Sequence, residues 1–468
     1  MSTLIKNGTI VTAGDTYPAD ILIEGEKIVQ IGSNLHADNA QVVNAEKMLV
    51  MPGGIDVHTH LELPFGGTVA SDDYITGHRA AAFGGTTSHI DFVIQPAGGS
   101  LHDGLDTWRK KADGKASIDY GFHLAVTDLN DRVMNEIPSL VDEGITSIKL
   151  FMAYKGVLQV DDTTLFKGMM KAAEAGMLTM VHAENGDAID VLVKAALAKG
   201  QVDPKYHGLT RPEWAEAEAS GRAIMLAGIA GAPLYVVHMT CEGSLDMLRY
   251  GRDKGFKVMG ETCVQYLFFT QDNLAAPGYE GAKYVCSPPM RQPKDQQALW
   301  RALSSGLLQV VSTDHCPFYY DGTKPGTIRG KELGEGNFSK IPNGVPGIED
   351  RQMIMWEKGV NGGHFNANRF VELTATNPAK IFGMYPRKGS VAVGGDADIV
   401  LWDAHARHTI SAATMHMRTD YNLYEGWQVS GKPSKVFLRG KLIVDGDTWL
   451  GEQGKGQFVR RSPYAPVL

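Results

Sequence analysis

Eight short apolar runs recur through the middle of the chain, and this repetition restricts the possible folds more than any other feature. Segments with helical periodicity separate most of them, for example Thr163–Ala175, Pro212–Ala230 and Lys294–Leu303. Strands that alternate with helices predict a parallel sheet, and eight of them within about 330 residues predict a (β/α)8, TIM-like barrel with insertions. Gly322–Gly336 is rich in glycine and charge, which predicts a long surface loop. The runs are Gly54–Val57, Thr87–Ile94, Ile118–Val126, Ser147–Phe151, Leu178–His182, Leu234–His238, Phe256–Glu261 and Gln309–Thr313.

The two ends of the chain are rich in short strands instead. Ile21–Val29 is typical of two strands around a turn at Gly25, and Ala397–Trp402 is strand-like. Val436–Val444 repeats this pattern with a turn at Gly440. The simplest interpretation is one small β domain built from both termini. The predicted parts are the first half of the β domain (1–51), the barrel (52–383), the second half of the β domain (384–450) and a C-terminal tail (451–468).

Composition argues against several classes of partner. The net charge is −8, with 45 basic and 53 acidic residues and no basic block that would favour nucleic acid. No apolar run approaches the roughly 20 residues that a membrane helix needs. The N-terminus lacks the apolar core of a secretory signal, and the four cysteines form no C-x-x-C pair. We therefore expect a cytoplasmic protein with reduced thiols that binds neither nucleic acid nor membranes.

Six potential metal ligands lie within or just after these runs. His58 and His60 follow the first run, and side chains two apart in a strand point to the same face, so both imidazoles can reach one ion. In a barrel the C-terminal ends of the strands meet on one face. An open, doubly wound sheet is the alternative fold, but it would spread these residues apart, and no G-x-G-x-x-G motif supports it. The candidate ligands are His58, His60, Lys149, His182, His238 and Asp314.

Among these ligands, Lys149 indicates two ions rather than one. Neutral imidazoles suit zinc, manganese and similar divalent ions, but an ammonium group cannot coordinate. A desolvated lysine with a lowered pKa can react with carbon dioxide, and the resulting carbamate has two oxygens that can bridge two ions. Two ions about 3.5–4 Å apart lower the pKa of a bridging water toward neutrality. His89, His123 and His315 are candidates for hydrogen-bond partners behind the ligands.

Motifs along the whole chain carry a resemblance to a known family. They include Pro52–Leu63, Val181–Gly186, Tyr284–Pro289 and Lys340–Gly344. In these stretches the chain resembles the amidohydrolase superfamily, and within it the dihydropyrimidinase/hydantoinase group. The resemblance implies a β-sandwich beside the barrel, two zinc ions and a homotetramer with the tail at a subunit interface. It implies that the more buried ion is bound by His58, His60 and Asp314, the more exposed ion by His182 and His238, and both by carboxylated Lys149.

The same resemblance implies how a substrate would be held. Tyr154 would donate to the carbonyl oxygen that becomes an oxyanion, and Asp314 would carry a proton to the leaving nitrogen. Ser287 and Asn343 would hold a cyclic amide through main-chain groups. The apolar lid around the ring substituent would consist of Leu63, Phe65, Phe151 and Leu158.

The expected function is therefore metal-dependent opening of a small cyclic amide. Dihydrouracil and dihydrothymine would give N-carbamoyl-β-amino acids, and hydantoins would give N-carbamoyl-α-amino acids. Dihydroorotases carry an arginine two residues after the second histidine, where this chain has Glu62. Allantoinases lack a tyrosine at the position of Tyr154. A non-catalytic scaffold with this fold lacks metal ligands, whereas all six positions are filled here. Allantoinase-like and scaffold functions stay as alternatives.

Overall fold

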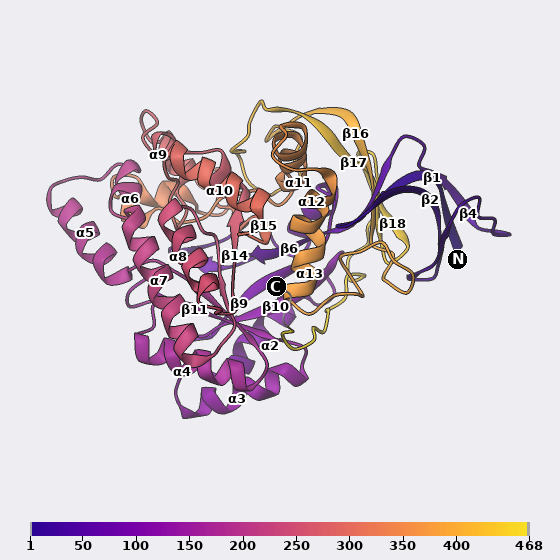
Figure 1. The fold of residues 1–468 in the computed structure, drawn as a ribbon. Helices are drawn as coiled ribbons and strands as arrows, with labels where there is room; N and C mark the ends of the chain where they lie inside the picture. Colours follow the sequence, from indigo (N-terminus) through magenta and orange to yellow (C-terminus); the bar gives the residue numbers. More distant parts are fainter. Residues whose placement is uncertain (1, 466–468) are drawn as a thin grey trace.

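Eight parallel strands form the centre of the molecule (Figure 1), in a computed structural model that describes residues 2–465. Nearly every residue of these strands is buried, as expected for strands covered by helices outside and by packed side chains inside. A backbone bridge between Thr59 and His315 links the first strand to the segment after the last and nearly closes the sheet. The predicted (β/α)8 barrel is confirmed. In the order of their pairing, its strands are β6 (Gly54–Thr59), β9 (Thr86–Ile94), β10 (Asp119–Ala125), β11 (Ser147–Phe151), β12 (Leu178–His182), β13 (Leu234–Val236), β14 (Val258–Cys263) and β15 (Val310–Ser312).

Helices surround the barrel, and the three that periodicity predicted are present as α4 (Asp162–Glu174), α7 (Glu213–Ala230) and α10 (Pro293–Ser305). Helix α4 begins where the Asp161 carboxylate accepts a hydrogen bond from the backbone N–H of Thr164 at 2.8 Å. The other helices are α1 (Thr76–Phe83), α2 (Leu101–Ala112), α3 (Asp131–Asp142), α5 (Gly186–Ala198), α6 (Lys205–Leu209), α8 (Glu242–Asp253), α9 (Gln271–Leu274), α11 (Arg351–Ile354), α12 (Ala367–Val371) and α13 (Asn377–Ile381).

A second β-rich body lies beside the barrel and combines both ends of the chain (Figure 1). The two ends meet where β5 pairs with β16 in antiparallel register, Val50 opposite Leu401. The β domain predicted from the chain ends is confirmed, whereas its boundaries with the barrel stay a prediction. Its strands are β1 (Ser2–Val11), β2 (Thr16–Glu24), β3 (Lys27–Gly32), β4 (Gln41–Asn44), β5 (Leu49–Pro52), β16 (Ile399–Thr409), β17 (Gln428–Leu438), β18 (Lys441–Asp445) and β19 (Thr448–Trp449).

A buried cluster of charges joins the barrel to the β domain. Lys388 is fully buried, and its Nζ lies 2.7 Å from Asp119 in β10 and 2.5 Å from Asp398 beside β16. Asp396 also lies 3.2 Å from this ammonium, and Arg439 pairs with Asp119. The three carboxylates therefore surround a lysine already, which makes this cluster a structural ion-pair network.

The tail crosses the N-terminal ends of the barrel strands. Backbone hydrogen bonds join Val459 to Tyr120, Arg461 to Gly144 and Tyr464 to Gly176. The Arg461 guanidinium is buried, and its Nη2 donates to Ser147 Oγ at 2.9 Å. The described part of the tail thus covers the N-terminal ends of β10, β11 and β12 in this chain's own barrel. Its expected place at a subunit interface stays a prediction.

The segment 322–336 is only partly the surface loop that its composition predicted. Most residues from Thr323 to Arg329 are exposed, but Lys331 is fully buried in a short 3-10 turn (Lys331–Gly334). The loop prediction is wrong at this residue. A charged residue in a glycine-rich stretch is usually solvated, and only acceptors from distant parts of the chain make its burial possible.

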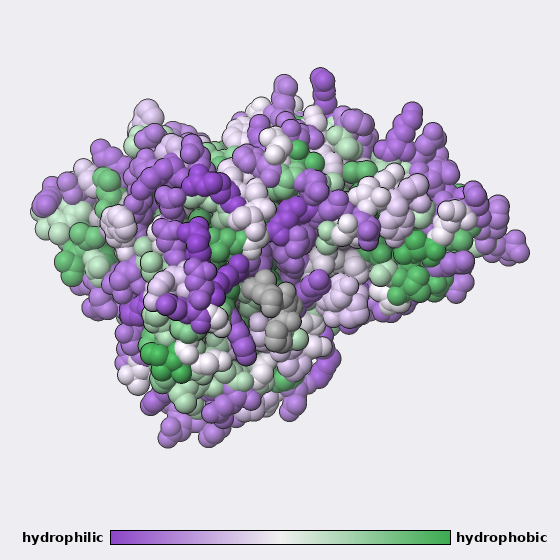
Figure 2. All heavy atoms as spheres, viewed as in Figure 1, coloured by the Kyte–Doolittle hydropathy of each residue, from purple (hydrophilic) through white to green (hydrophobic). Residues whose placement is uncertain are grey.

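Figure 2 shows one face, on which polar residues predominate and one of the smaller apolar patches lies over α5. Val191 on α5 and Trp214 and Ile229 on α7 are largely exposed. Among residues 2–465, no helix combines the length and the apolar character needed to cross a membrane.

Candidate metal centre

The six predicted ligands all lie at the C-terminal end of the barrel. His58 is in β6 and His60 directly follows it, while His182 is the last residue of β12. Lys149 lies within β11, and His238 and Asp314 each come two residues after their strand. All six side chains are buried or nearly so. The strand ends of a barrel meet on one face, so residues up to 256 positions apart in the sequence converge here.

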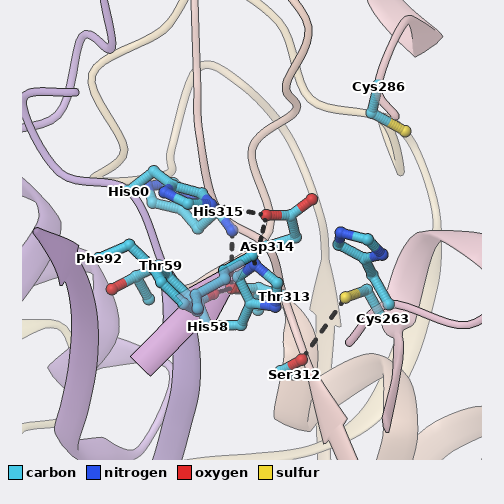
Figure 3. A network of polar contacts seen from close by, with 12 residues as sticks. His58, Thr59, His60, Phe92, Cys263, Cys286, Ser312, Thr313, Asp314 and His315 are labelled. Atoms are coloured by element: carbon cyan, nitrogen blue, oxygen red, sulfur yellow. Dashed lines mark hydrogen bonds and ion pairs between the residues drawn. The ribbon is translucent and has the colours of Figure 1, made fainter. Parts of the chain in front are cut away.

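Three of these side chains form a close cluster (Figure 3). The Nε2 atoms of His58 and His60 each lie 3.0 Å from Oδ1 of Asp314. The Nζ atom of Lys149 is 3.2 Å from His58 Nε2. One possible ligand atom from each of the two histidines and the aspartate lies within 4.8 Å of the others, which is the spacing that a shared ion requires.

The other two histidines continue this cluster. The ring centres of His182 and His238 are 4.6 Å apart, and the ring of His238 lies 5.3 Å from that of His58. The Nε2 atom of His182 lies 2.7 Å from Oε2 of Glu184 and is hydrogen-bonded to it, so Nδ1 is the ring nitrogen that could coordinate a metal ion. Within the described chain, Nδ1 of His60 and of His238 is buried without a hydrogen-bond partner. This set of imidazole and carboxylate donors suits divalent ions such as zinc.

Burial and neighbouring charges adjust these groups for metal binding. Burial lowers the pKa of Lys149 to about 8 and that of His60 to about 4. Burial alone would raise the pKa of Asp314, but His58 and His60 outweigh it and hold this pKa well below its usual range. The site therefore contains a neutral imidazole at His60, an ionised carboxylate, and a lysine that loses its proton more easily than an exposed one.

Lys149 lies between two aromatic rings rather than among oxygen acceptors. Its Nζ is 4.0 Å from the ring centre of Phe92 and 4.8 Å from that of Phe151. His58 Nε2 is its only hydrogen-bond partner within the described residues. An amine with few acceptors is poorly stabilised as an ammonium, which favours the neutral form that reacts with carbon dioxide.

A cavity of about 1200 Å³ opens above the cluster. Five of the six predicted ligands line it, and His58 lies behind them. The Tyr154 ring centre is 5.2 Å from that of His182, and Asn343 Nδ2 donates to Ser287 Oγ at 3.0 Å. The structure thus brings all predicted substrate-contacting residues to one cavity, and their roles stay predictions. These residues are Leu63, Phe65, Phe151, Tyr154, Leu158, Ser287 and Asn343.

Three predicted site residues have unusual backbone conformations. Tyr154, His238 and Asp314 have φ angles of +67°, +38° and +52°, in the left-handed region that non-glycine residues rarely adopt. Such conformations cost about 1 kcal/mol or more each and persist where the surrounding structure enforces them. Three of them around one cavity are typical of a functional site.

Comparison with known proteins agrees with this geometry. A family model described as "Amidohydrolase family" matches residues 49–443. The chain belongs to the amidohydrolase family. It is 50% identical to a D-hydantoinase of Geobacillus stearothermophilus over 100% of this chain and 98% of that protein. It is 49% identical to a D-hydantoinase of Streptomyces coelicolor over 98% of each chain. The crystal structure of dihydropyrimidinase from Brevibacillus agri NCHU1002 superposes with a TM-score of 0.97 at 53% identity, covering 99% of this chain and 100% of that one.

Amidohydrolases depend on metal ions, and this amidohydrolase has the donor groups for them. Two buried carboxylates behind its histidines were assigned no role from the sequence. Glu261 Oε1 lies 2.5 Å from Nδ1 of His58, and its Oε2 accepts a hydrogen bond from Tyr235 at 3.0 Å. Glu184 accepts from His182. A signal for both existed, because an acidic residue inside or just after an apolar run needs a buried partner.

The three histidines proposed as partners behind the ligands support this amidohydrolase site indirectly. His315 Nε2 donates to Asp72 at 3.0 Å, and its Nδ1 accepts from the backbone N–H of Gly347. His89 Nδ1 lies 2.8 Å from Oγ of Thr59, the residue between His58 and His60. His123 lies 2.5 Å from Ser147 Oγ. Each contacts a residue near a ligand rather than a ligand ring.

Proposed function

We propose that this amidohydrolase opens dihydropyrimidines, hydantoins or both to N-carbamoyl amino acids. One observation carries the proposal. Four histidines, Lys149 and Asp314 converge on a cavity whose wall contains Tyr154, Ser287 and Asn343, in a chain that is half identical to a D-hydantoinase along its whole length. The small molecule would enter this cavity with its amide toward the metal ligands and its substituent toward the apolar side chains.

The proposed cofactors are two divalent ions, which we infer to be zinc, and a carboxylated Lys149. His58, His60 and Asp314 would hold one ion, His182 and His238 the other, and the carbamate of Lys149 would bind both. When bound, the ions would supply a hydroxide at neutral pH. The lowered pKa of Lys149 and the few acceptors around its amine support its carboxylation.

The side chains around the substrate would then control charge and protons. Burial raises the pKa of Tyr154, so its phenol keeps the proton that it would donate to the developing oxyanion. Asp314 is ionised and can accept a proton, which it would pass to the ring nitrogen as the C–N bond breaks. Phe65 and Phe151 pack around the Tyr154 ring, with ring centres 5.3 and 6.1 Å away, and would exclude water.

Parallel kinetics on several rings test this proposal. The enzyme, loaded with zinc in the presence of bicarbonate, is assayed for kcat/KM with dihydrouracil, hydantoin, a 5-aryl hydantoin and allantoin. We expect turnover of at least one of the first three. Turnover of allantoin alone would replace the proposal by an allantoinase-like function. If the enzyme has its full metal content and opens none of the four rings, a non-catalytic scaffold function would be favoured.

We further propose a cytoplasmic homotetramer without nucleic-acid or membrane partners. Val191 on α5 and Trp214 and Ile229 on the neighbouring helix α7 are exposed apolar side chains, which contacts with further copies would cover. The four free, buried cysteines are consistent with a reducing compartment. Light scattering at several concentrations tests the assembly: a mass of about 50.7 kDa throughout would contradict it.

A further inference from the structure

The buried side chain of Lys331 ends between two segments that line the cavity. Its Nζ donates to the carbonyl oxygens of Val285 at 2.7 Å, Pro342 at 2.9 Å and Gly344 at 2.7 Å. The three donors of an ammonium group therefore meet three acceptors. None of the ion pairs among residues 2–465 involves Lys331, so these three carbonyls, with the Phe318 ring centre 6.0 Å away, compensate for its removal from water.

The two segments held by Lys331 are the ones that carry the proposed ring-binding residues. Val285 lies two residues before Ser287, while Pro342 and Gly344 flank Asn343. The segments are also joined to each other, by a hydrogen bond from Gly344 N to the Val285 carbonyl at 3.0 Å and by the Asn343 to Ser287 bond described above. The Lys331 ammonium group and these two hydrogen bonds thus fix the spacing between two parts of the cavity wall that are distant in the sequence.

The convergence of two carbonyls on Lys331 also orients the peptide groups of Asn343. In a trans peptide group, the C=O and the N–H of the next residue point in opposite directions. Because the Pro342 carbonyl points to Lys331, the N–H of Asn343 points away from it. Because the Gly344 N–H points to the Val285 carbonyl, the C=O of Asn343 points away from that carbonyl. Asn343 lines the cavity, whereas Lys331 does not. An adjacent donor and acceptor is the pattern that pairs with a cyclic amide.

We propose that Lys331 is a positioning residue for ring binding, which acts through the main chain of Asn343 and Ser287. This inference rests on the proposed function, because it assumes a cyclic amide as the bound molecule. Lys331 would hold the two segments at the spacing that matches the ring, without contacting substrate or metal. Its loss should therefore weaken substrate binding and leave the metal ligands in place.

Steady-state kinetics of Lys331→Met, measured on the zinc-loaded enzyme with hydantoin and dihydrouracil, test this role. We expect KM to rise about tenfold or more, because the segments lose their shared donor, while kcat changes by less than about threefold. Metal content per chain should equal that of the wild type. Lys331→Gln keeps amide N–H donors and should give a smaller rise in KM. The matched control is Lys388→Met, which removes another buried lysine at the joint between the domains and should leave KM unchanged.

Each outcome decides between a positioning role and a purely structural one. A lower melting temperature with unchanged KM in both Lys331 variants would overturn the proposal. So would an equal rise of KM in Lys388→Met, which would mark a general effect of destabilisation. If Lys331→Met does not fold, Lys331→Gln decides by the same criterion. A wild-type enzyme with full metal that opens neither ring would instead refute the proposed function, and this assignment with it.

Discussion

Two fully buried lysines, Lys149 and Lys331, belong to the two sides of the proposed active site and have opposite surroundings. Burial lowers the pKa of both amines, to about 8 for Lys149 and about 7 for Lys331, so their pKa values do not distinguish the two lysines. The two lysines differ in the groups that surround their amines. Lys149 has one imidazole nitrogen and two aromatic rings nearby, whereas Lys331 has a carbonyl oxygen for each of its three donors. The amine of Lys149, with one partner, keeps room to react, whereas the amine of Lys331, with all three donors occupied, holds its partners together.

The same contrast extends to the elements that carry each side. The metal side, which carries the six proposed ligands, is built on or just after barrel strands. Parallel pairing along their length fixes these strands. The substrate side, which carries Ser287 and Asn343, is built on loops. The positions of these loops depend on hydrogen bonds between distant segments, such as those from Lys331 to the Val285 carbonyl and from His207 to the Cys286 carbonyl at 2.8 Å. Loss of a contact on the metal side should therefore weaken metal binding, whereas loss of a contact between the loops of the substrate side should raise KM.

The largest effect is expected for Lys149→Ala. Without the proposed carbamate of Lys149, the two proposed ions would have no shared ligand, so the variant should lose most bound metal and at least about a thousandfold in kcat/KM. Metal analysis by mass spectrometry and kinetics on hydantoin measure both quantities. Lys331→Met is the matched control, because it removes the other lysine and should keep the metal. Full metal content in Lys149→Ala would contradict the bridging role.

A smaller effect, confined to turnover, is expected for Tyr154→Phe. Removal of one oxyanion donor should lower kcat by about 10²–10³-fold and leave the metal content unchanged. Tyr421→Phe is the matched control, since it removes a buried hydroxyl that has no hydrogen-bond partner within the described chain. If kcat of Tyr154→Phe equals that of the wild type, Tyr154 has no part in the mechanism.

The sequence predicts the two sides of the site to different extents. The proposed metal ligands could be named because they lie in or just after apolar runs, and the period of a strand places His58 and His60 on one face. Their convergence follows from the barrel itself. Ser287 and Asn343 could be named only through resemblance, because nothing in a loop sequence indicates which residues it will meet.

Residues that depend on long-range partners escaped the sequence analysis altogether. Lys331 was expected on the surface, since its three acceptors lie between 11 and 46 positions away. Glu261 lies 203 positions from His58, so that its role becomes visible only once the strands are placed side by side. Periodicity reports the environment of a strand or helix, but not the pairing of one polar side chain with another.

Glu261→Gln should weaken metal binding without abolishing it. The Glu261 carboxylate orients the His58 ring and makes it more basic, and a neutral amide keeps the hydrogen bond without the charge. We expect metal affinity to fall by about 10–100-fold, measured by competition with a chelator. The control is Glu216→Gln, a buried carboxylate that pairs with Arg291 rather than with a histidine. Unchanged affinity would show that Glu261 supports only the fold.

The smallest effect on catalysis is expected for Lys388→Met, which lies on neither side of the site. This change leaves Asp398 without its ion-pair partner in a buried position, while Asp119 keeps Arg439 and Asp396 keeps Lys27 and Arg387. Breaking a buried pair in this way costs about 3–5 kcal/mol, so the unfolding midpoint should fall clearly in a denaturant titration. In the absence of denaturant, where the variant is folded, its metal content and KM should equal those of the wild type. A changed KM would mean that the loops around Ser287 and Asn343 depend on the contacts between the two domains, and a change equal to that of Lys331→Met would overturn the positioning role of Lys331.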